Sequence, residues 1–201
     1  MATSGDILIR DGDLFIRVMR DSPDDYQLIT GWLAQEHVHE WWDHDAPPLA
    51  YDAVVAEYRS QAGGDSPTQS CIIEIASRPV GHIQFYPWAA YADELAETGA
   101  VLPDGSWGID VFIGEPDCVE LGLGSRTVRL TCEYLIAERD AVAVALLVAK
   151  ANPRAQRAYL KAGMEQTGEA LDTDIKDGER VPCFVMVRYD SPATTARISS
   201  P

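Results

Sequence analysis

The chain has 201 residues, of which 46% are hydrophobic, and a formal net charge of −16 at pH 7. This length suits one domain with a sizeable core, and the negative charge argues against nucleic acid or an anionic membrane surface as a partner. The sequence has neither a run of about eighteen apolar residues nor a secretory signal pattern, so we expect a soluble cytoplasmic protein, either a monomer or a homodimer.

The first half of the chain predicts two hairpins and two helices. Apolar runs on both sides of Asp11-Gly12 predict a hairpin. Ser22 and Pro23 are typical of the start of a helix. A helical period then covers residues 49–62, and "SCIIEIA" and "VGHIQFYPW" predict a second hairpin. Residues 88–106 are expected to be a long acidic loop or an irregular helix.

The second half alternates strands and helices. "SWGIDVFIG" and "VAVALLVA" predict strands, and residues 122–139 and 152–162 predict helices. Two more strands surround "DIKDGER". The whole pattern predicts an α/β fold with a mixed sheet in a single domain over residues 1–190, followed by a disordered tail over 191–201.

The charges are unevenly distributed. Between Asp21 and Glu120, 19 acidic residues accompany only two basic ones. A later stretch is rich in basic residues, namely Arg126, Arg129, Lys150, Arg154, Arg157 and Lys161. The first region can attract a cation and the second an anion, although an acidic surface that serves only solubility would give the same composition.

Gly122 and Gly124 lie in the turn between a predicted strand and a predicted helix. Such a turn directs backbone N–H groups and the helix dipole toward an anion, and glycine allows a phosphate to approach closely. Alone, the two glycines are explained better by a tight structural turn, because the spacings GxxxxGK[ST] and GxGxxG are both absent from the sequence.

A family resemblance gives this turn its context. "GIDVFIGEPDCVELGLGSRTVRL" and "ANPRAQRAYLKAGM" resemble the core of the GNAT superfamily of acetyl-CoA-dependent acyltransferases. With "HVHEWW" and "GHIQFY" in the same order, the chain resembles the aminoglycoside 6′-N-acetyltransferases over roughly residues 14–190. This implies a mostly antiparallel sheet with a splayed parallel strand pair, and direct transfer of acetyl from acetyl-CoA to an aminoglycoside amine, which confers resistance.

The resemblance assigns catalytic and cofactor-binding roles. Asp110 would accept the amine proton or orient the ammonium, and Tyr159 would protonate the leaving thiolate, although core packing also explains Tyr159. The backbone of Val111, Phe112 and Ile113 would hold the pantetheine arm. Further cofactor contacts are expected from Leu121, Gly122, Leu123, Gly124, Ser125, Arg126, Asn152 and Arg157. Either arginine could equally lie on a solvated helix face.

Three consecutive positions depart from the superfamily pattern. Val119, Glu120 and Leu121 stand where the superfamily usually has Arg or Gln, then Gly, then often a basic residue. A carboxylate beside a pyrophosphate would lower cofactor affinity unless the Glu120 side chain faces solvent.

The amine substrate is expected in the acidic half. Polycationic amino sugars need carboxylates to pair their ammonium groups and aromatic faces to cover their rings. The resemblance aligns Trp42, Gln84, Tyr86 and Asp93 with pocket positions. Secondary candidates are Glu40, Trp41, Glu94, Glu97, Trp107 and Asp174 or Asp177, although Trp41 could equally anchor the core.

Other chemistries find less support. His37, His39 and His44 could share a metal if their segment were extended, but no further ligand cluster accompanies them, so we predict no metal. Four cysteines without CxxC spacing predict buried free thiols, at Cys71, Cys118, Cys132 and Cys183.

Two rival functions stay open. One is a siderophore-pathway acyltransferase that acylates a lysine-type amine, a group that tends to carry His where this chain has Asp110. The other is a binding protein that sequesters a cationic ligand without catalysis.

Overall fold

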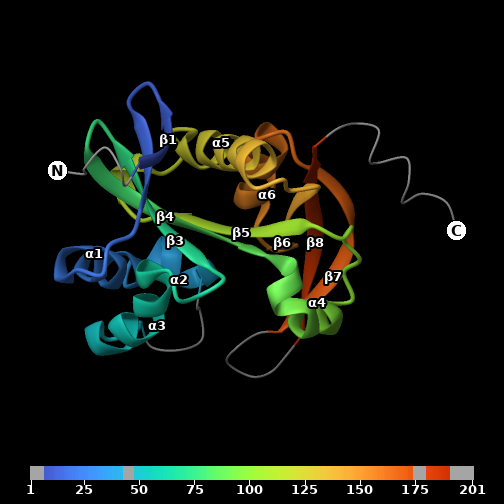
Figure 1. The fold of residues 1–201 in the computed structure, drawn as a ribbon, viewed down its shortest axis with the longest axis horizontal. Coiled ribbons are helices and arrows are strands. Elements are labelled where there is room, and N and C mark those ends of the chain that lie inside the picture. Colours follow the sequence, from blue (N-terminus) through green and yellow to red (C-terminus); the bar gives the residue numbers. More distant parts are fainter. Residues whose placement is uncertain (1–6, 43–47, 174–179, 191–201) are drawn as a thin grey trace, which may run out of the picture.

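The strands of the protein form one mixed sheet (Figure 1). The computed structural model describes residues 7–42, 48–173 and 180–190. The strand order is β1-β2-β3-β4-β5-β6-β8-β7, and every pair is antiparallel except β5–β6. The strands are β1 (Ile7–Asp11), β2 (Leu14–Val18), β3 (Gln69–Ile75), β4 (Arg78–Pro87), β5 (Ser106–Ile113), β6 (Ala143–Ala149), β7 (Glu165–Thr173) and β8 (Arg180–Tyr189).

Helices cover both faces of the sheet (Figure 1). One core lies between the sheet and the pair α5–α6, and another lies under α1, α2 and α3. A third core packs α4 and the preceding short helix against β6 and β8. The helices are α1 (Pro23–Leu33), α2 (Glu36–Trp42), α3 (Tyr51–Gly63), η1 (Trp88–Tyr91), α4 (Ala92–Thr98), η2 (Pro116–Cys118), α5 (Leu123–Glu138) and α6 (Pro153–Lys161).

Local signals in the sequence explain where elements begin. Ser22 Oγ accepts a hydrogen bond from Asp25 N at 3.4 Å, and Asn152 Oδ1 accepts one from Ala155 N at 3.0 Å. Each side chain therefore satisfies an amide that the first turn of its helix leaves unpaired. The Asp11-Gly12 turn joins β1 to β2 as predicted, with Gly12 at a φ of 58° that favours glycine.

A buried charge network joins α1 to the sheet. Arg17 on β2 contacts Asp25 Oδ2 and Glu74 Oε1, each at 2.6 Å. The Arg17 and Asp25 side chains are both only 4% exposed. One guanidinium therefore holds a carboxylate from α1 and another from β3 in a region that water hardly reaches.

The parallel pair β5–β6 separates along its length. The two strands pair only where Ser106–Gly108 meets Ala143–Ala145, after which β6 stays with β8 and β5 stays with β4. The gap that opens between them is the predicted splay.

The structure decides between alternatives that the sequence left open. Residues 88–106 contain η1 and α4, which agrees with the predicted irregular helix and not with a long loop. His37 and His39 lie on α2 rather than on an extended segment, because this stretch folds as a helix that buries Val38. The four cysteines are free and buried, as predicted. In the part of the chain that the structure describes, no helix has the length and apolar character needed to span a membrane. The predicted tail lies outside the described residues.

Candidate active site

Two cavities meet where β5 and β6 separate. The first, of about 400 Å³, lies between β5, β6, α2, α6 and the loop that leads into α5. The second, of about 270 Å³, lies between the end of β4, α4 and β7. Asp110 and Leu147 line both cavities. Asp110, the predicted acceptor of the amine proton, is thus within reach of a ligand on either side.

The edge of β5 that faces the first cavity has main-chain groups directed away from β4. Gly114 N donates to Val80 O at 2.9 Å, so the opposed residues Gly81 and Ile113 form a non-hydrogen-bonded pair of the antiparallel ladder. The N–H and C=O groups of Ile113 therefore point away from β4, and the period of two gives Val111 the same orientation. Ile113 O already accepts a hydrogen bond from His37 Nε2 at 2.9 Å. The Ile113 N–H and both main-chain groups of Val111 have the geometry that the prediction for these two residues requires.

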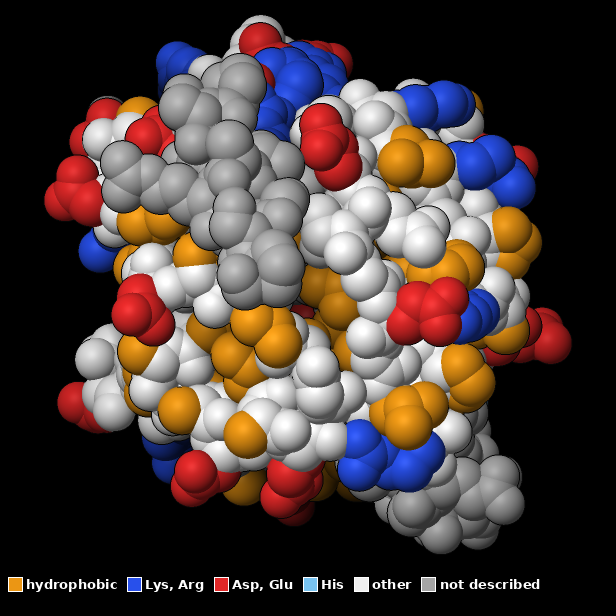
Figure 2. All heavy atoms as spheres, turned by 90° about the vertical axis from the view of Figure 1, so that its right-hand side faces the viewer, with side chains coloured by type: hydrophobic (Ala, Val, Ile, Leu, Met, Phe, Trp, Pro, Cys, Tyr) orange, Lys and Arg blue, Asp and Glu red, His pale blue; other side chains and the backbone are white. Residues whose placement is uncertain are grey.

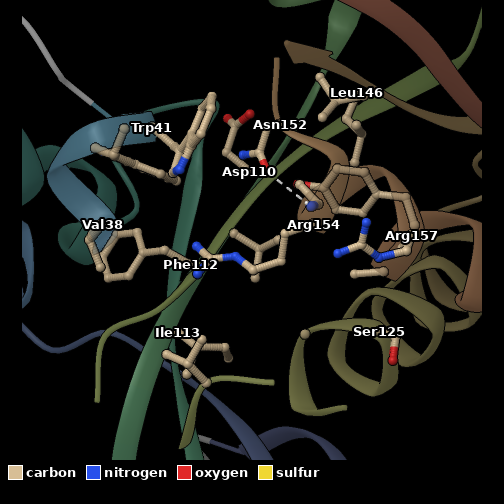
Figure 3. A pocket seen from close by; sticks show the side chains of 18 of the residues that line it. Val38, Trp41, Asp110, Phe112, Ile113, Ser125, Leu146, Asn152, Arg154 and Arg157 are labelled. Carbon is tan, nitrogen blue, oxygen red and sulfur yellow. Dashed lines mark hydrogen bonds between the residues drawn. The ribbon is translucent and has the colours of Figure 1, made fainter. Parts of the chain in front are cut away.

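Phe112 has a different place from the one predicted. Its main-chain groups belong to the ladder with His82, because successive residues of a strand direct these groups to opposite sides. Its backbone is therefore not free to hold a ligand, and the prediction for Phe112 is wrong in this respect. Its side chain instead lines the first cavity (Figure 3).

The glycine turn at the start of α5 opens into the first cavity. Gly122 caps the helix with a φ of 80°, which explains this glycine by the turn alone. At Gly124, however, φ is not positive, and an added Cβ would meet no protein atom within 4 Å. The fold itself does not need glycine there, whereas a ligand that approaches the backbone closely would.

The flanking side chains of this turn differ in their exposure. Ser125 lines the cavity, and its Oγ donates to Gly122 O at 2.9 Å. Leu121 is 68% exposed and Leu123 packs against the core, so neither side chain lines the cavity among the described residues. Glu120 does line it, with an exposed side chain and a φ of 63° that is unfavourable for residues other than glycine.

Basic side chains of α6 line the same cavity. Arg157 does so as predicted, and Arg154 and Lys161 join it (Figure 3). Arg154 reaches across to α2, where Nη2 donates to His37 O at 3.3 Å. Arg154 was not predicted as a site residue, although its spacing of three from Arg157 places both on one side of a helix.

Arg126 is turned away from this cavity. Its Nε contacts Asp11 Oδ2 at 2.9 Å and its Nη1 contacts Asp13 Oδ1 at 2.9 Å, so it binds the β1–β2 hairpin. The predicted role of Arg126 in cofactor binding is therefore not supported. The ion pairs join residues more than a hundred positions apart in the chain, and no local pattern indicates them.

Asp110 is held by two neighbours on β4. Gln84 Nε2 donates to Asp110 Oδ2 at 3.0 Å, and the Tyr86 hydroxyl also hydrogen-bonds the carboxylate. Burial raises the pKa of Asp110 above its usual range, and the two hydrogen bonds oppose this effect. Gly108 makes room for Tyr86, because an added Cβ would lie 2.3 Å from the tyrosine ring.

Tyr159 lines the first cavity from α6. Burial, with a contribution from the negative charge of Asp110, raises the pKa of its hydroxyl above the usual value. The side chain is thus a phenol at neutral pH and can donate a proton. Tyr159 also packs against the core, as the alternative interpretation expected, so the two roles are compatible.

The second cavity is acidic. Tyr86, Glu94 and Glu97 line it as predicted, together with four residues not predicted for it: Trp88, Thr98, Leu147 and Asp172. Among the described residues that line it, none is basic. Such a cavity favours a cation with an apolar part. On the β7–β8 side of the molecule, acidic, basic and hydrophobic side chains are interspersed at the surface (Figure 2).

Some predicted substrate residues lie elsewhere. Asp93 is exposed on α4 and Glu40 is exposed on α2, and the described lining of the second cavity includes neither. Trp107 lies on the opposite face of β5 from Asp110, since residues an odd number apart on a strand face opposite ways. Its ring packs on that of Phe85, with the ring centroids 6.2 Å apart. Asp174 and Asp177 lie outside the described residues.

The two neighbouring tryptophans of α2 belong to the first cavity. Trp41 and Trp42 both line it, and Trp42 packs edge-on against Phe112 with ring centroids 4.7 Å apart. They face α6 across the cavity, as the position of Trp41 opposite Arg154 and Arg157 shows (Figure 3). The prediction that Trp42 contacts the amine substrate therefore needs the substrate to extend into the first cavity.

Comparison with known proteins identifies the family. Residues 21–171 match the family described as "Acetyltransferase (GNAT) domain". The chain belongs to this family. As expected for a GNAT domain, the sheet is mostly antiparallel and opens at one parallel pair.

Several relatives of this GNAT domain have been characterised. The chain is 27% identical over 151 residues to the aminoglycoside N(6')-acetyltransferase type 1 of Klebsiella pneumoniae and of Serratia marcescens, with 75% of this chain and 74% of each relative covered. AAC(6')-Ib in complex with ribostamycin and coenzyme A has a TM-score of 0.76 at 24% identity, covering 94% of this chain and 98% of that one.

More distant GNAT structures share the same fold. Spermidine N-acetyltransferase from Vibrio cholerae, in complex with CoA and spermine, has a TM-score of 0.69 at 15% identity, with 90% of this chain and 97% of that chain covered. Likeness at this level shows the fold, and the acceptor must be argued from the second cavity.

Proposed function

We propose that the protein transfers the acetyl group of acetyl-CoA to a primary amine, the 6′-amine, of an aminoglycoside. The observation that carries the proposal is the place of Asp110, which lines both the cavity beside the glycine turn and the acidic cavity. A cofactor on one side and an amine on the other can then meet at one carboxylate without a covalent acyl-enzyme.

The first cavity fits acetyl-CoA. The N–H groups of the first turn of α5, from Gly122 to Ser125, would bind the pyrophosphate, because a helix N-terminus favours an anion. Arg154, Arg157 and Lys161 would pair with the other phosphate. The main-chain groups of Val111 and the N–H of Ile113 would hydrogen-bond the pantetheine amides, whereas Ile113 O is bonded to His37 Nε2. When bound, acetyl-CoA supplies an activated thioester at the neck between the cavities.

The residues around Asp110 then have distinct roles. The neutral amine nitrogen attacks the thioester carbonyl, the new C–N bond forms, and the C–S bond breaks. Asp110 takes the proton that the amine gives up, while Gln84 and Tyr86 fix the orientation of its carboxylate. Tyr159 gives its proton to the departing thiolate and becomes a phenolate. The proton that Asp110 has taken from the amine is then available to restore the phenol, so that the site returns to its starting charge.

The second cavity supports an amino sugar as the acceptor. Its acidic side chains, Glu94, Glu97 and Asp172, suit further ammonium groups of a polycation, and the Tyr86 and Trp88 rings suit a sugar face. A protein that only binds a cation would have no use for a second cavity that meets the first at a carboxylate.

The test is release of free thiol from acetyl-CoA by the purified protein. Kanamycin, gentamicin, a lysine derivative and no acceptor are compared, and NMR of the product locates the acetyl group. We expect turnover with the aminoglycosides and acetylation at the 6′-amine. Turnover with the lysine derivative alone would contradict the substrate class, and binding of acetyl-CoA without turnover on any amine would favour the sequestering protein.

Replacing Tyr159 with Phe tests the proton donor. We expect kcat to fall by about 100-fold with little change in KM for the amine, because the ring that packs is kept while the proton is lost. Tyr134→Phe is the matched control, since Tyr134 packs on Phe85 from α5 and should leave kcat unchanged. An unchanged kcat in Tyr159→Phe would assign Tyr159 to packing alone.

Replacing Glu120 tests the unusual loop. Glu120→Gln removes the charge, and Glu120→Gly also removes the unfavourable φ of 63°. We expect both to lower the Kd of coenzyme A about fivefold in calorimetry, because two like charges near water repel by about 1 kcal/mol at close range. Only Glu120→Gly should also raise the melting temperature. Glu138→Gln, at the exposed far end of α5, is the control, and an equal Kd for all four proteins would refute the repulsion.

A further inference from the structure

The two cavities adjoin at two shared lining residues, one polar and one apolar, and we call this place the neck. Asp110 of β5 and Leu147 of β6 are the described residues common to both linings. The strand register explains this pairing: Gly108 lies beside Ala145, so the residues two positions further along, Asp110 and Leu147, stand at the same level on the same face of the parallel pair. An amine that moves from the second cavity to a thioester in the first must pass between a carboxylate and an isobutyl group.

The apolar side of the neck continues into the second cavity. Leu147 and Tyr86 both pack against the core that contains Trp88, and all three line the cavity. The carboxylates come from other elements, Glu94 and Glu97 from α4 and Asp172 from β7. A bound ligand can therefore place its ammonium groups toward α4 and β7, but it presents its remaining surface to side chains with few hydrogen-bonding groups.

We propose that Leu147 is a specificity-determining residue, which admits an acceptor amine whose neighbouring carbons carry hydrogen rather than hydroxyl and which keeps water out of the neck. The proposal rests on the proposed acetyl transfer, because the neck matters only if an amine crosses it. A hydroxyl pressed against Leu147 loses its hydrogen bonds to water and finds no partner on that side. The expected penalty is about 10- to 100-fold in kcat/KM.

Two matched pairs of acceptors test this selection. Kanamycin B is compared with dibekacin, its 3′,4′-dideoxy derivative, and 1,3-diamino-2-propanol is compared with 1,3-diaminopropane. Within each pair the aminomethyl group is the same and only hydroxyl groups near it differ. We expect the wild-type protein to prefer the deoxygenated member by about tenfold or more.

The variant Leu147→Asn tests the residue, because Asn has a similar size and offers hydrogen bonds. We expect the preference within each pair to fall by about tenfold, through a higher kcat/KM for the hydroxylated member. The matched control is Leu171→Asn, on β7, where the side chain is 44% exposed and lines neither cavity among the described residues. The preference of Leu171→Asn for the deoxygenated acceptor should equal that of the wild type. A change seen only in Leu147→Asn is then not due to a general loss of packing.

A second readout needs no acceptor. Slow hydrolysis of acetyl-CoA without amine should rise about tenfold in Leu147→Asn and stay constant in Leu171→Asn, because a polar side chain admits water to the thioester. Equal preferences in wild type and Leu147→Asn, or unchanged hydrolysis if no amine is acetylated, would overturn the role of Leu147. Turnover of the diamines alone would refute the aminoglycoside as substrate, while the diamine pair would still decide the role of Leu147.

Discussion

The variant Asp110→Asn will have a kcat/KM about 10²- to 10⁴-fold below that of the wild type, while its affinity for coenzyme A stays within a factor of about two. Asn keeps the size of the side chain and can still bond Gln84, but it cannot take a proton from the amine. Because Asp110 contributes its side chain at the neck and not to the phosphate end of the first cavity, cofactor binding should survive. Steady-state kinetics and calorimetry on the same preparations measure both quantities.

The pH dependence supplies a second check on Asp110. Burial raises the pKa of this carboxyl, and only the ionised form can accept a proton. As the pH falls, wild-type kcat/KM should therefore begin to drop at a higher pH than an ordinary aspartate would cause. Asp110→Asn should lack this part of the profile. The control is Asp93→Asn, at an exposed position of α4, which should have the same pH profile as the wild type. A kcat/KM of Asp110→Asn equal to that of the wild type would show that Asp110 takes no part in the mechanism.

The features that the sequence predicted well are those set by short-range patterns. The Asp11-Gly12 turn, the Ser22 cap and the glycine that begins α5 follow from rules that act within a few residues. The same holds for the buried strand β6. Tyr86 and Asp110 could be assigned to one site only through the family resemblance, because periodicity alone does not fix which strands are neighbours.

The predictions were wrong where the position of a residue depends on strand parity or on contacts between distant parts of the chain. Counting alternate residues along β5 from Asp110 excludes Trp107 from the substrate side, and the same count assigns the Phe112 backbone to the ladder. On β7, Asp172 lies two residues beyond the buried Ala170, so parity could also have found it. By contrast, the ion pairs that hold Arg126 at the β1–β2 hairpin depend on the whole fold and leave no local signal.

The Arg17 network will make the largest single contribution to stability among the ion pairs described. We expect Arg17→Met to lower the free energy of unfolding by about 3–5 kcal/mol, because it leaves Asp25 and Glu74 charged in a buried region without a cation. Asp25 also accepts a hydrogen bond from Arg20 N at 2.8 Å. This single neutral donor cannot replace the charged guanidinium. Urea denaturation monitored by tryptophan fluorescence measures the change.

Arg78→Met is the matched control, since Arg78 also holds two acids, Glu115 and Asp117, but with its side chain 53% exposed. Water can solvate those acids when the arginine is removed, so the urea midpoint should move much less than in Arg17→Met. A change in urea midpoint that is equally small for both variants would show that α1 is held to the sheet by apolar packing instead of by Arg17.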